Sequence, residues 1–379
     1  MMKADALSLY VHIPFCIRKC NYCDFCSFSD IKEEDRRAYV DALLREISEY
    51  KSEPKLLLNT VFFGGGTPSL LTEHELCKIT EKIREVFDLS PGCEFTLESN
   101  PKTVTREKLI TYKRCGVNRL SIGLQSIHEN ELKMLGRIHS FNDFLESYKL
   151  AREVGINNIN VDIMYSIPGQ TPKSFCETVE AVLALSPEHI SAYSLILEEG
   201  TPLYLQRDKL SFPSLDDECL MYEELCKRMS SAGYEHYEIS NYAKPGFMCR
   251  HNLVYWHAEE YIGVGLAAHS YFDGARFSNT EDLSEYLAEN YKEYRTRENI
   301  DEAVKEEEHI MLALRLREGI NLSKYRELFG KDFLEGKAAL VKRLVEAGLA
   351  TLTNTHFALT EKGFYVSNEI ICNLTKTPS

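Results

Sequence analysis

The chain has 379 residues, of which 44% are hydrophobic, enough to fill one large core and a smaller one. These values exclude a disulfide-stapled miniprotein and a mainly disordered chain. The 44 Lys and Arg residues are outnumbered by 58 Asp and Glu residues, and the resulting net charge of −14 argues against a broad basic surface for nucleic acid.

The start of the chain and its hydropathy carry no targeting signal. No apolar run approaches the length of a membrane span, and Met1 to Leu9 lack the charged-then-apolar pattern of a secretory leader. We therefore expect a cytoplasmic protein without a transmembrane segment, and peripheral membrane contact stays open. The 12 cysteines of such a chain indicate metal or redox chemistry rather than disulfides.

Short β-rich runs alternate with amphipathic helical stretches over the first half of the chain, a pattern typical of parallel sheets built from βαβ units. The expected strands are Leu9–Ile13, Thr60–Phe63, Glu94–Glu98, Arg119–Leu124, Asn158–Met164 and His189–Leu195. The expected helices are Glu33–Tyr50, Glu73–Phe87, Arg106–Cys115, Phe141–Val154 and Lys173–Leu185. The pattern predicts an α/β fold in which residues 1–200 form a partial (β/α)6 barrel of the TIM type.

The pattern changes after Gly200. We expect a helix around Asp216–Ser231 and interpret the Tyr-, His- and Gly-rich stretch from Tyr234 to Phe277 as short strands and loops, so that residues 201–300 extend the barrel. Beyond them we expect helices at Ile310–Leu316, Leu322–Phe329 and Phe333–Ala347, a hairpin of Leu349–Leu352 and His356–Leu359, and a last helix that begins at Thr360. Residues 301–379 are therefore predicted to form a mostly helical, winged-helix-like C-terminal domain, and the acidic balance argues against DNA as its partner.

Four cysteines, Cys16, Cys20, Cys23 and Cys26, directly follow the first expected strand. Their spacing lets several thiolates converge on one centre. Four thiolates suit a closed structural zinc site, whereas three thiolates on a [4Fe–4S] cluster leave one iron open to a small molecule. The other cysteines are scattered singly, and we expect them to be inert small hydrophobic residues.

Glycine-rich and polar loops follow the other expected strands, where parallel barrels carry their chemistry. These loops are Gly64–Pro68, Glu98–Pro101, Gln125–Ser126 and Tyr165–Gln170. The side chains of Glu98, Gln125, Arg137 and Asp162 can bind an ammonium group, ribose hydroxyls or a carboxylate. A zinc site needs none of them, whereas a cofactor with an amino acid, a ribose and a purine does, so the open-iron interpretation is favoured.

Six motifs in this order resemble those of the radical S-adenosylmethionine proteins of the HemN/HemW group. They are Leu9–Cys16 with the spaced cysteines, Gly64–Ser69, Glu98–Pro101, Gly123–Ser126, Gly136–His139 and Ile167–Gln170. The resemblance implies that Cys16, Cys20 and Cys23 hold a [4Fe–4S] cluster whose fourth iron binds S-adenosylmethionine. It also implies a set of residues that bind this cofactor: Tyr10, Tyr22, Gly66, Thr67, Glu98, Gln125, Arg137 and Asp162. Reduction of the cluster would cleave the cofactor to methionine and a 5′-deoxyadenosyl radical, and no catalytic residue is assigned.

The group has two subfamilies with different functions, the oxygen-independent coproporphyrinogen III dehydrogenases and the HemW proteins, regarded as haem chaperones. The dehydrogenases have a long N-terminal arm and a cysteine two positions after the third ligand. Here few residues precede Tyr10, and Phe25 stands in place of that cysteine. These features favour the haem chaperones, while Cys26 fits neither pattern and its role stays open.

The segment His251-Asn252-Leu253-Val254-Tyr255-Trp256 matches a motif associated with haem binding in HemW proteins. A histidine can bind haem iron, and Tyr255 and Trp256 can cover a porphyrin face. The motif could instead cap a turn and fill the core, and Cys249 is a thiolate candidate for haem iron if it is exposed. We expect a haem-binding chaperone whose partners are a haem-receiving client protein and an electron donor; the alternative is a coproporphyrinogen III dehydrogenase.

Overall fold

The computed structural model describes residues 7–288, 290–298 and 300–375. The structure does not describe residues 1–6, 289, 299 and 376–379. Most of the N-terminal stretch Met1–Leu9 therefore lies outside the described residues. The chain divides into two compact units, one of Met1–Met221 with Glu260–Glu298 and one of Tyr222–Glu259 with Asn299–Ser379.

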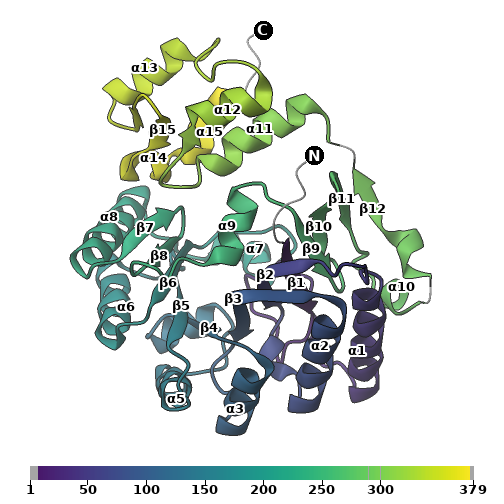
Figure 1. Cartoon of the computed structure of the whole chain (residues 1–379). Coiled ribbons are helices and arrows are strands. Elements are labelled where there is room, and N and C mark those ends of the chain that lie inside the picture. Colours follow the sequence, from purple (N-terminus) through teal and green to yellow (C-terminus); the bar gives the residue numbers. More distant parts are fainter. Residues whose placement is uncertain (1–6, 289, 299, 376–379) are drawn as a thin grey trace. The chain divides into compact units, whose positions relative to one another are not determined.

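The first unit is built on parallel strands that alternate with helices (Figure 1). Its first six strands are β1 (Leu7–Ile13), β2 (Leu57–Gly65), β3 (Asp88–Ser99), β4 (Arg119–Gln125), β5 (Asn158–Tyr165) and β6 (His189–Ser194). Each strand pairs in parallel with the next one along the chain. The predicted α/β class and the six predicted strands are confirmed, with β3 beginning earlier than expected, at Asp88.

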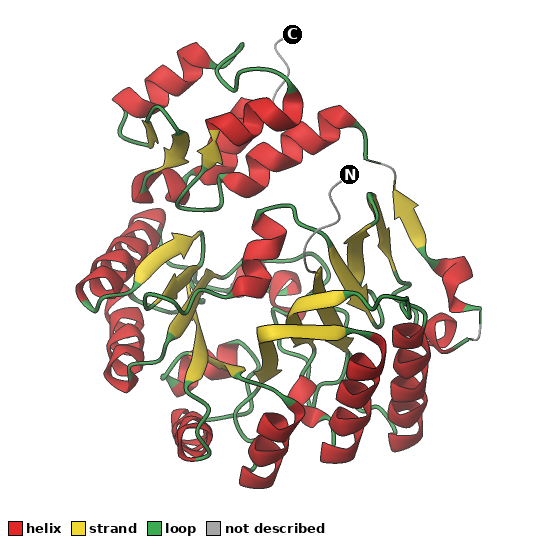
Figure 2. Cartoon of the chain, in the orientation of Figure 1, coloured by secondary structure: helices red, strands yellow, loops and turns green. Residues whose placement is uncertain are grey.

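Helices connect the strands and cover the outer face of the sheet (Figure 2). They are α1 (Glu33–Ser48), α2 (Glu73–Val86), α3 (Arg106–Cys115), α5 (Phe141–Glu153) and α6 (Pro172–Leu185). The short helices η1 (Pro68–Leu70) and α4 (Glu129–Met134) lie in connections between strands, and α7 (Pro202–Leu205) and η2 (Arg207–Lys209) follow β6. Capping boxes begin α2 at Thr72, α5 at Ser140 and α6 at Thr171, which satisfies backbone N–H groups where each helix follows its loop. The five predicted helices are present, and α4 is an additional short one.

A later segment of the chain returns to the first unit. Strand β9 (Tyr261–Val264) pairs in parallel with β1, and β10 (His269–Phe272), β11 (Ala275–Ser278) and β12 (Thr296–Glu298) continue the sheet in antiparallel pairs. The fully buried carboxylate of Glu46 holds this segment, because it accepts from Tyr286 Oη at 2.6 Å and from Arg295 Nη2 at 2.7 Å. Tyr286 lies on the short helix α10 (Leu283–Leu287), and Arg295 directly follows the short helix η3 (Tyr291–Tyr294).

The second unit combines helices with short antiparallel strands. Helix α8 (Leu215–Ser231) leads into it, followed by β7 (Glu235–Glu238), β8 (Asn241–Ala243) and α9 (Arg250–Trp256). The C-terminal part contains α11 (Glu302–Ala313), β13 (Ile320–Asn321), α12 (Leu322–Phe329), α13 (Ala338–Glu346), β14 (Ala350–Leu352), β15 (His356–Leu359), α14 (Glu361–Tyr365) and α15 (Ser367–Thr375). Strands β13, β15 and β14 form one sheet in that order.

Three details differ from the sequence-based expectations. Arg250–Trp256 is a helix rather than part of a strand and loop region. Helix α11 begins at Glu302, where Asp301 caps its first turn by accepting from Val304 N, and it ends at Ala313, before the expected Leu316. Helix α13 begins at Ala338, later than expected. In the described part of the chain, no helix combines the length and the apolar character that a membrane span requires.

Candidate cofactor site

The carboxyl ends of the parallel strands open on a cavity of about 300 Å³. Its walls contain most of the predicted site residues, namely Cys16, Cys20, Tyr22, Cys23, Gly66, Thr67, Glu98, Gln125, Arg137 and Asp162. Asn100, Gly123, Met164 and Tyr193 contribute further wall area. The structure thus brings together side chains that come from five different strand ends.

The cysteine-bearing loop between β1 and α1 is closed by its own backbone. Phe28 N donates to Pro14 O at 2.7 Å, and Cys16 N donates to Phe28 O at 2.9 Å. Burial raises the pKa of the Cys23 thiol, and the neighbouring Cys20 and Cys16 raise it further. The loop therefore holds three thiols near one another, an arrangement that favours a positively charged partner.

Cys26 points away from this group. Its Sγ donates to the backbone oxygen of Glu281 at 3.8 Å, and its backbone oxygen lies 2.8 Å from His12 Nε2. The contact with His12 ties the end of the loop to β1, and the contact with Glu281 ties it to the segment between Ser278 and Leu283.

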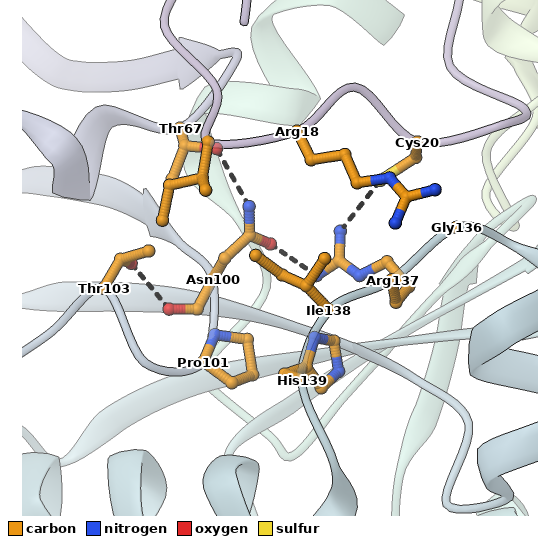
Figure 3. Close-up of a pocket in the computed structure, with 11 residues that line it drawn as sticks. Arg18, Cys20, Thr67, Asn100, Pro101, Thr103, Gly136, Arg137, Ile138 and His139 are labelled. Atoms are coloured by element: carbon orange, nitrogen blue, oxygen red, sulfur yellow. Dashed lines mark hydrogen bonds between the residues drawn. The ribbon is translucent and has the colours of Figure 1, made fainter. Parts of the chain in front are cut away.

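Arg137 reaches the cysteine loop from the segment after α4 (Figure 3). Its Nη1 donates to Cys20 Sγ at 3.4 Å and its Nη2 to Gly123 O at 2.7 Å. The Nη2 also donates to the side chain of Asn100, whose Nδ2 donates to Thr67 Oγ1 at 2.9 Å. The Nε of Arg137 is buried and has no hydrogen-bond partner among the described residues. A buried guanidinium with a vacant N–H fits an anionic group in the cavity.

Asn100 is a site residue that the sequence analysis missed. It connects Arg137 to Thr67, as the dashed lines in Figure 3 show. The signal for it lies within the motif Glu98–Pro101, where only the carboxylate was assigned a role.

Glycine and strained backbone shape the cavity wall. A Cβ on Gly66 would lie 2.8 Å from the backbone oxygen of Phe15, so this position has no room for a side chain, whereas one on Gly123 would lie 2.9 Å from Gln125 Nε2 and would displace that side chain. Gln125 itself has φ +70°, at a register shift between β4 and β5. Left-handed backbone in a buried non-glycine residue costs about 1–3 kcal/mol and is typical of binding sites.

Two carboxyl groups on the wall repel each other. Burial and, after it, the neighbouring carboxylate of Asp162 together raise the pKa of Glu98 to about 8, although Gly65 N donates to the Glu98 carboxylate. Burial also raises the pKa of Asp162, which accepts from Asn160 Nδ2 at 2.7 Å and from Ser121 Oγ at 3.2 Å. Hydroxyl or ammonium donors in the cavity would relieve this repulsion.

The two predicted tyrosines differ in position. Tyr22 lines the cavity, and burial raises its pKa. Tyr10 lies beside Glu98 with its Oη 3.0 Å from His12 Nδ1, and it is not among the residues that line the cavity.

The predicted haem motif lies on α9 in the second unit. His251 Nε2 lies 2.9 Å from Tyr255 Oη, and the two rings meet edge to face. The Trp256 indole N–H donates to the buried carboxylate of Glu238. Cys249 is fully buried, so the condition set for it as a haem thiolate is not met, and His251 is almost as buried, at 1% exposure. One of these hydrogen bonds lies within the motif, and the other ties it to β7.

Comparison with family models gives two matches. The chain matches the radical SAM superfamily over residues 10–182 and the HemN C-terminal domain over residues 300–366.

Curated relatives extend this result over almost the whole chain. The chain is 37% identical over 370 residues to "Heme chaperone HemW" of Bacillus subtilis (strain 168), covering 96% of this chain and 97% of that protein. It is 34% identical to the protein of the same name from Lactococcus lactis subsp. lactis (strain IL1403), covering 96% of each. The solved structure of coproporphyrinogen III oxidase (HemN) from Escherichia coli has a TM-score of 0.83 and 23% identity, covering 98% of this chain and 90% of that one, which shows a shared fold. The chain therefore belongs to the HemW family of radical S-adenosylmethionine proteins.

Proposed function

We propose that this protein is a haem chaperone of the HemW type that holds a [4Fe–4S] cluster and S-adenosylmethionine in the cavity at the strand ends. The observation that carries the proposal is the convergence of three thiols, a buried guanidinium and two buried carboxyl groups on that cavity. The two relatives named heme chaperone each match 96% of the chain, which supports the same function here.

In this proposal each side chain of the cavity has a defined task. Cys16, Cys20 and Cys23 bind the cluster, and Arg137 directs its vacant Nε–H toward an anionic group of the cofactor. Glu98 and Asp162 accept hydrogen bonds from the amino group or the ribose hydroxyls. Gln125, Gly66, Thr67, Tyr22 and Tyr10 complete the binding residues. A bound cluster supplies an open iron site and, when reduced, an electron for cleavage of the sulfonium.

The arrangement of the thiols favours a cluster over a single metal ion. Among residues that the structure describes, no three His, Cys, Asp or Glu side chains are arranged as ligands of one ion. Zinc needs four donors around one centre, whereas a four-iron cluster offers each thiolate a separate iron.

Haem contact is assigned to His251, Tyr255 and Trp256. An iron bound at His251 Nε2 would replace the hydroxyl of Tyr255, which is now 2.9 Å away. The rings of Tyr255 and Trp256 would contact a porphyrin face. The partners of the protein in this proposal are a haem-receiving client protein and an electron donor, and its location is the cytoplasm.

The proposal also keeps three domains along the chain, residues 1–200, 201–300 and 301–379. The haem motif then lies in the second of them.

The test joins two measurements on the full chain after anaerobic reconstitution with iron and sulfide. We expect a brown protein with one four-iron cluster, saturable haem uptake, and no decarboxylation of coproporphyrinogen. Conversion of coproporphyrinogen without haem uptake would support a dehydrogenase and reject the chaperone. A colourless protein with stoichiometric zinc would reject both.

A further inference from the structure

A second pair of cysteines lies outside the cofactor cavity. Cys77 is on α2 and Cys115 is the last residue of α3, and their Sγ atoms are 3.3 Å apart. The sequence analysis treated both as inert hydrophobic residues. Their thiols are instead in direct contact between two neighbouring helices of the barrel.

The two thiols have different surroundings. Cys77 is half-buried, and Arg114 Nη2 donates to its Sγ at 3.5 Å. Cys115 is only 4% exposed, and burial raises the pKa of its thiol. A guanidinium stabilises a neighbouring thiolate, whereas an apolar environment keeps a thiol protonated. Cys77 therefore suits the attacking sulfur and Cys115 the resolving one.

We propose that Cys77 and Cys115 are a redox site that forms a reversible disulfide when the protein meets a peroxide. The Cys77 thiolate attacks one peroxide oxygen, the O–O bond breaks, and the leaving hydroxide takes a proton to become water. Cys77 is then a sulfenic acid. The sulfur of Cys115 attacks the sulfur of Cys77, the S–O bond breaks, and the hydroxide leaves as water with the thiol proton. Two thiols are oxidised and one peroxide is reduced to two waters.

The position of the pair allows this bond to form with little movement. A disulfide bond is about 2.05 Å long, so the sulfurs must approach by roughly 1.3 Å from their present contact. Helix α2 follows the loop that contains Gly66, and α3 follows the end of β3, which carries Glu98, and the loop that contains Asn100. A disulfide would join the two helices behind two walls of the cofactor cavity. The proposal of a redox site does not depend on the proposed chaperone function.

Peptide mapping of the full chain tests the proposal. The reduced protein is treated with a small excess of hydrogen peroxide, its free thiols are alkylated, and it is digested with trypsin without reduction. Cleavage after Lys55, Lys78, Arg114 and Arg119 places the two cysteines in peptides 56–78 and 115–119. We expect the two peptides to be joined, with a mass that is smaller than the sum of their masses by two hydrogen atoms. Dithiothreitol should separate them again. Separate alkylated peptides after peroxide, or Cys77 linked to the peptide 20–32 instead, would overturn the proposal.

Variants distinguish the roles of the two sulfurs. Cys115→Ser should leave Cys77 as a sulfenic acid that dimedone traps, and Cys77→Ser should leave no sulfenic acid at Cys115. Arg114→Gln should slow disulfide formation about tenfold, because it removes the charge beside the Cys77 thiolate. Cys176→Ser, at another half-buried cysteine on α6, is the matched control and should leave the rate unchanged. Wild-type rates in Arg114→Gln would contradict the activation of Cys77.

Discussion

Asn160 links Asp162 on the cavity wall to a buried histidine. Its Nδ2 donates to Asp162 Oδ1 at 2.7 Å, and its Oδ1 lies 2.6 Å from His189 Nδ1. Burial lowers the pKa of His189, which is therefore neutral and donates through Nδ1. A chain of neutral donors thus fixes the carboxylate that we assign to the cofactor.

Replacement of Asn160 by leucine should loosen Asp162. We expect the free energy of unfolding to fall by about 1–3 kcal/mol, because buried polar groups lose a partner, and the Kd for S-adenosylmethionine to rise about tenfold. Urea unfolding and calorimetry on the reconstituted protein measure the two effects. Asn157→Ala, at an exposed position before the same strand, is the control. A lower free energy of unfolding with an unchanged Kd for S-adenosylmethionine would limit Asn160 to a structural role.

The two ends of the cysteine loop should respond differently to mutation. Cys20→Ala should abolish cluster assembly, because it removes one of the three thiols that line the cavity. Cys26→Ala should leave most of the cluster, because that thiol points toward Glu281 O. Iron and sulfide content with the absorption spectrum measures both. Equal loss in the two variants would make Cys26 a ligand.

Haem binding should depend on His251 and not on its neighbour His257. Loss of an iron ligand should weaken haem binding at least about tenfold in His251→Ala. His257 sits at the end of the same helix, half-buried, with Nε2 2.9 Å from Glu318 Oε1. His257→Ala should therefore leave haem affinity unchanged in a spectroscopic titration. Equal affinities in both variants would move the haem contact away from His251.

Glu238 should make stability depend on pH. Burial raises its pKa from the ordinary 4.5 to about 7, although Asn241, Ser240 N and Trp256 donate to it. Between these values the native carboxyl keeps a proton that the unfolded chain has released. Stability therefore falls as the pH rises from about 4.5 to about 7, and the loss persists above pH 7.

Glu238→Gln removes this titration. At pH 8 the variant should be more stable than the wild type by about 1–3 kcal/mol, with a flatter pH profile. Its new amide can donate to Asn241 Oδ1, which has no hydrogen-bond partner among the described residues. Glu235→Gln, exposed on the same strand, should change neither property. A wild-type pH slope in Glu238→Gln would assign the dependence to another group.

The parts of the fold that could be predicted are those with a local pattern. Strand β4 is buried along its whole length and carries Leu120, Ile122 and Leu124 at alternate positions, and it follows α3, whose N-cap Thr105 accepts from Lys108 N. Helix α9 was missed because it is short and its N-cap, Cys249, makes no capping hydrogen bond through its side chain. The pairing of β9 with β1 was missed because it joins segments far apart in the chain.

The site divides in the same way. Strand ends and the cysteine spacing mark most of the cavity wall, so those residues could be selected from the sequence. The contact of Cys77 with Cys115 and the link from Asn160 to His189 arise only when separate elements pack together. Neither hydrophobic periodicity nor residue spacing shows which polar residues of two separate elements will come into contact.

The position of β9 beside β1 bears on the order of events during synthesis. Strand β1, which ends at the cysteine loop, obtains its first neighbour early, but its other edge stays open until Tyr261–Val264 have been made. An open edge of this kind can pair with another nascent chain. If the cluster were assembled on the ribosome, β1 would still have one unpaired edge. If it were assembled after release of the chain, both edges of β1 would already be paired.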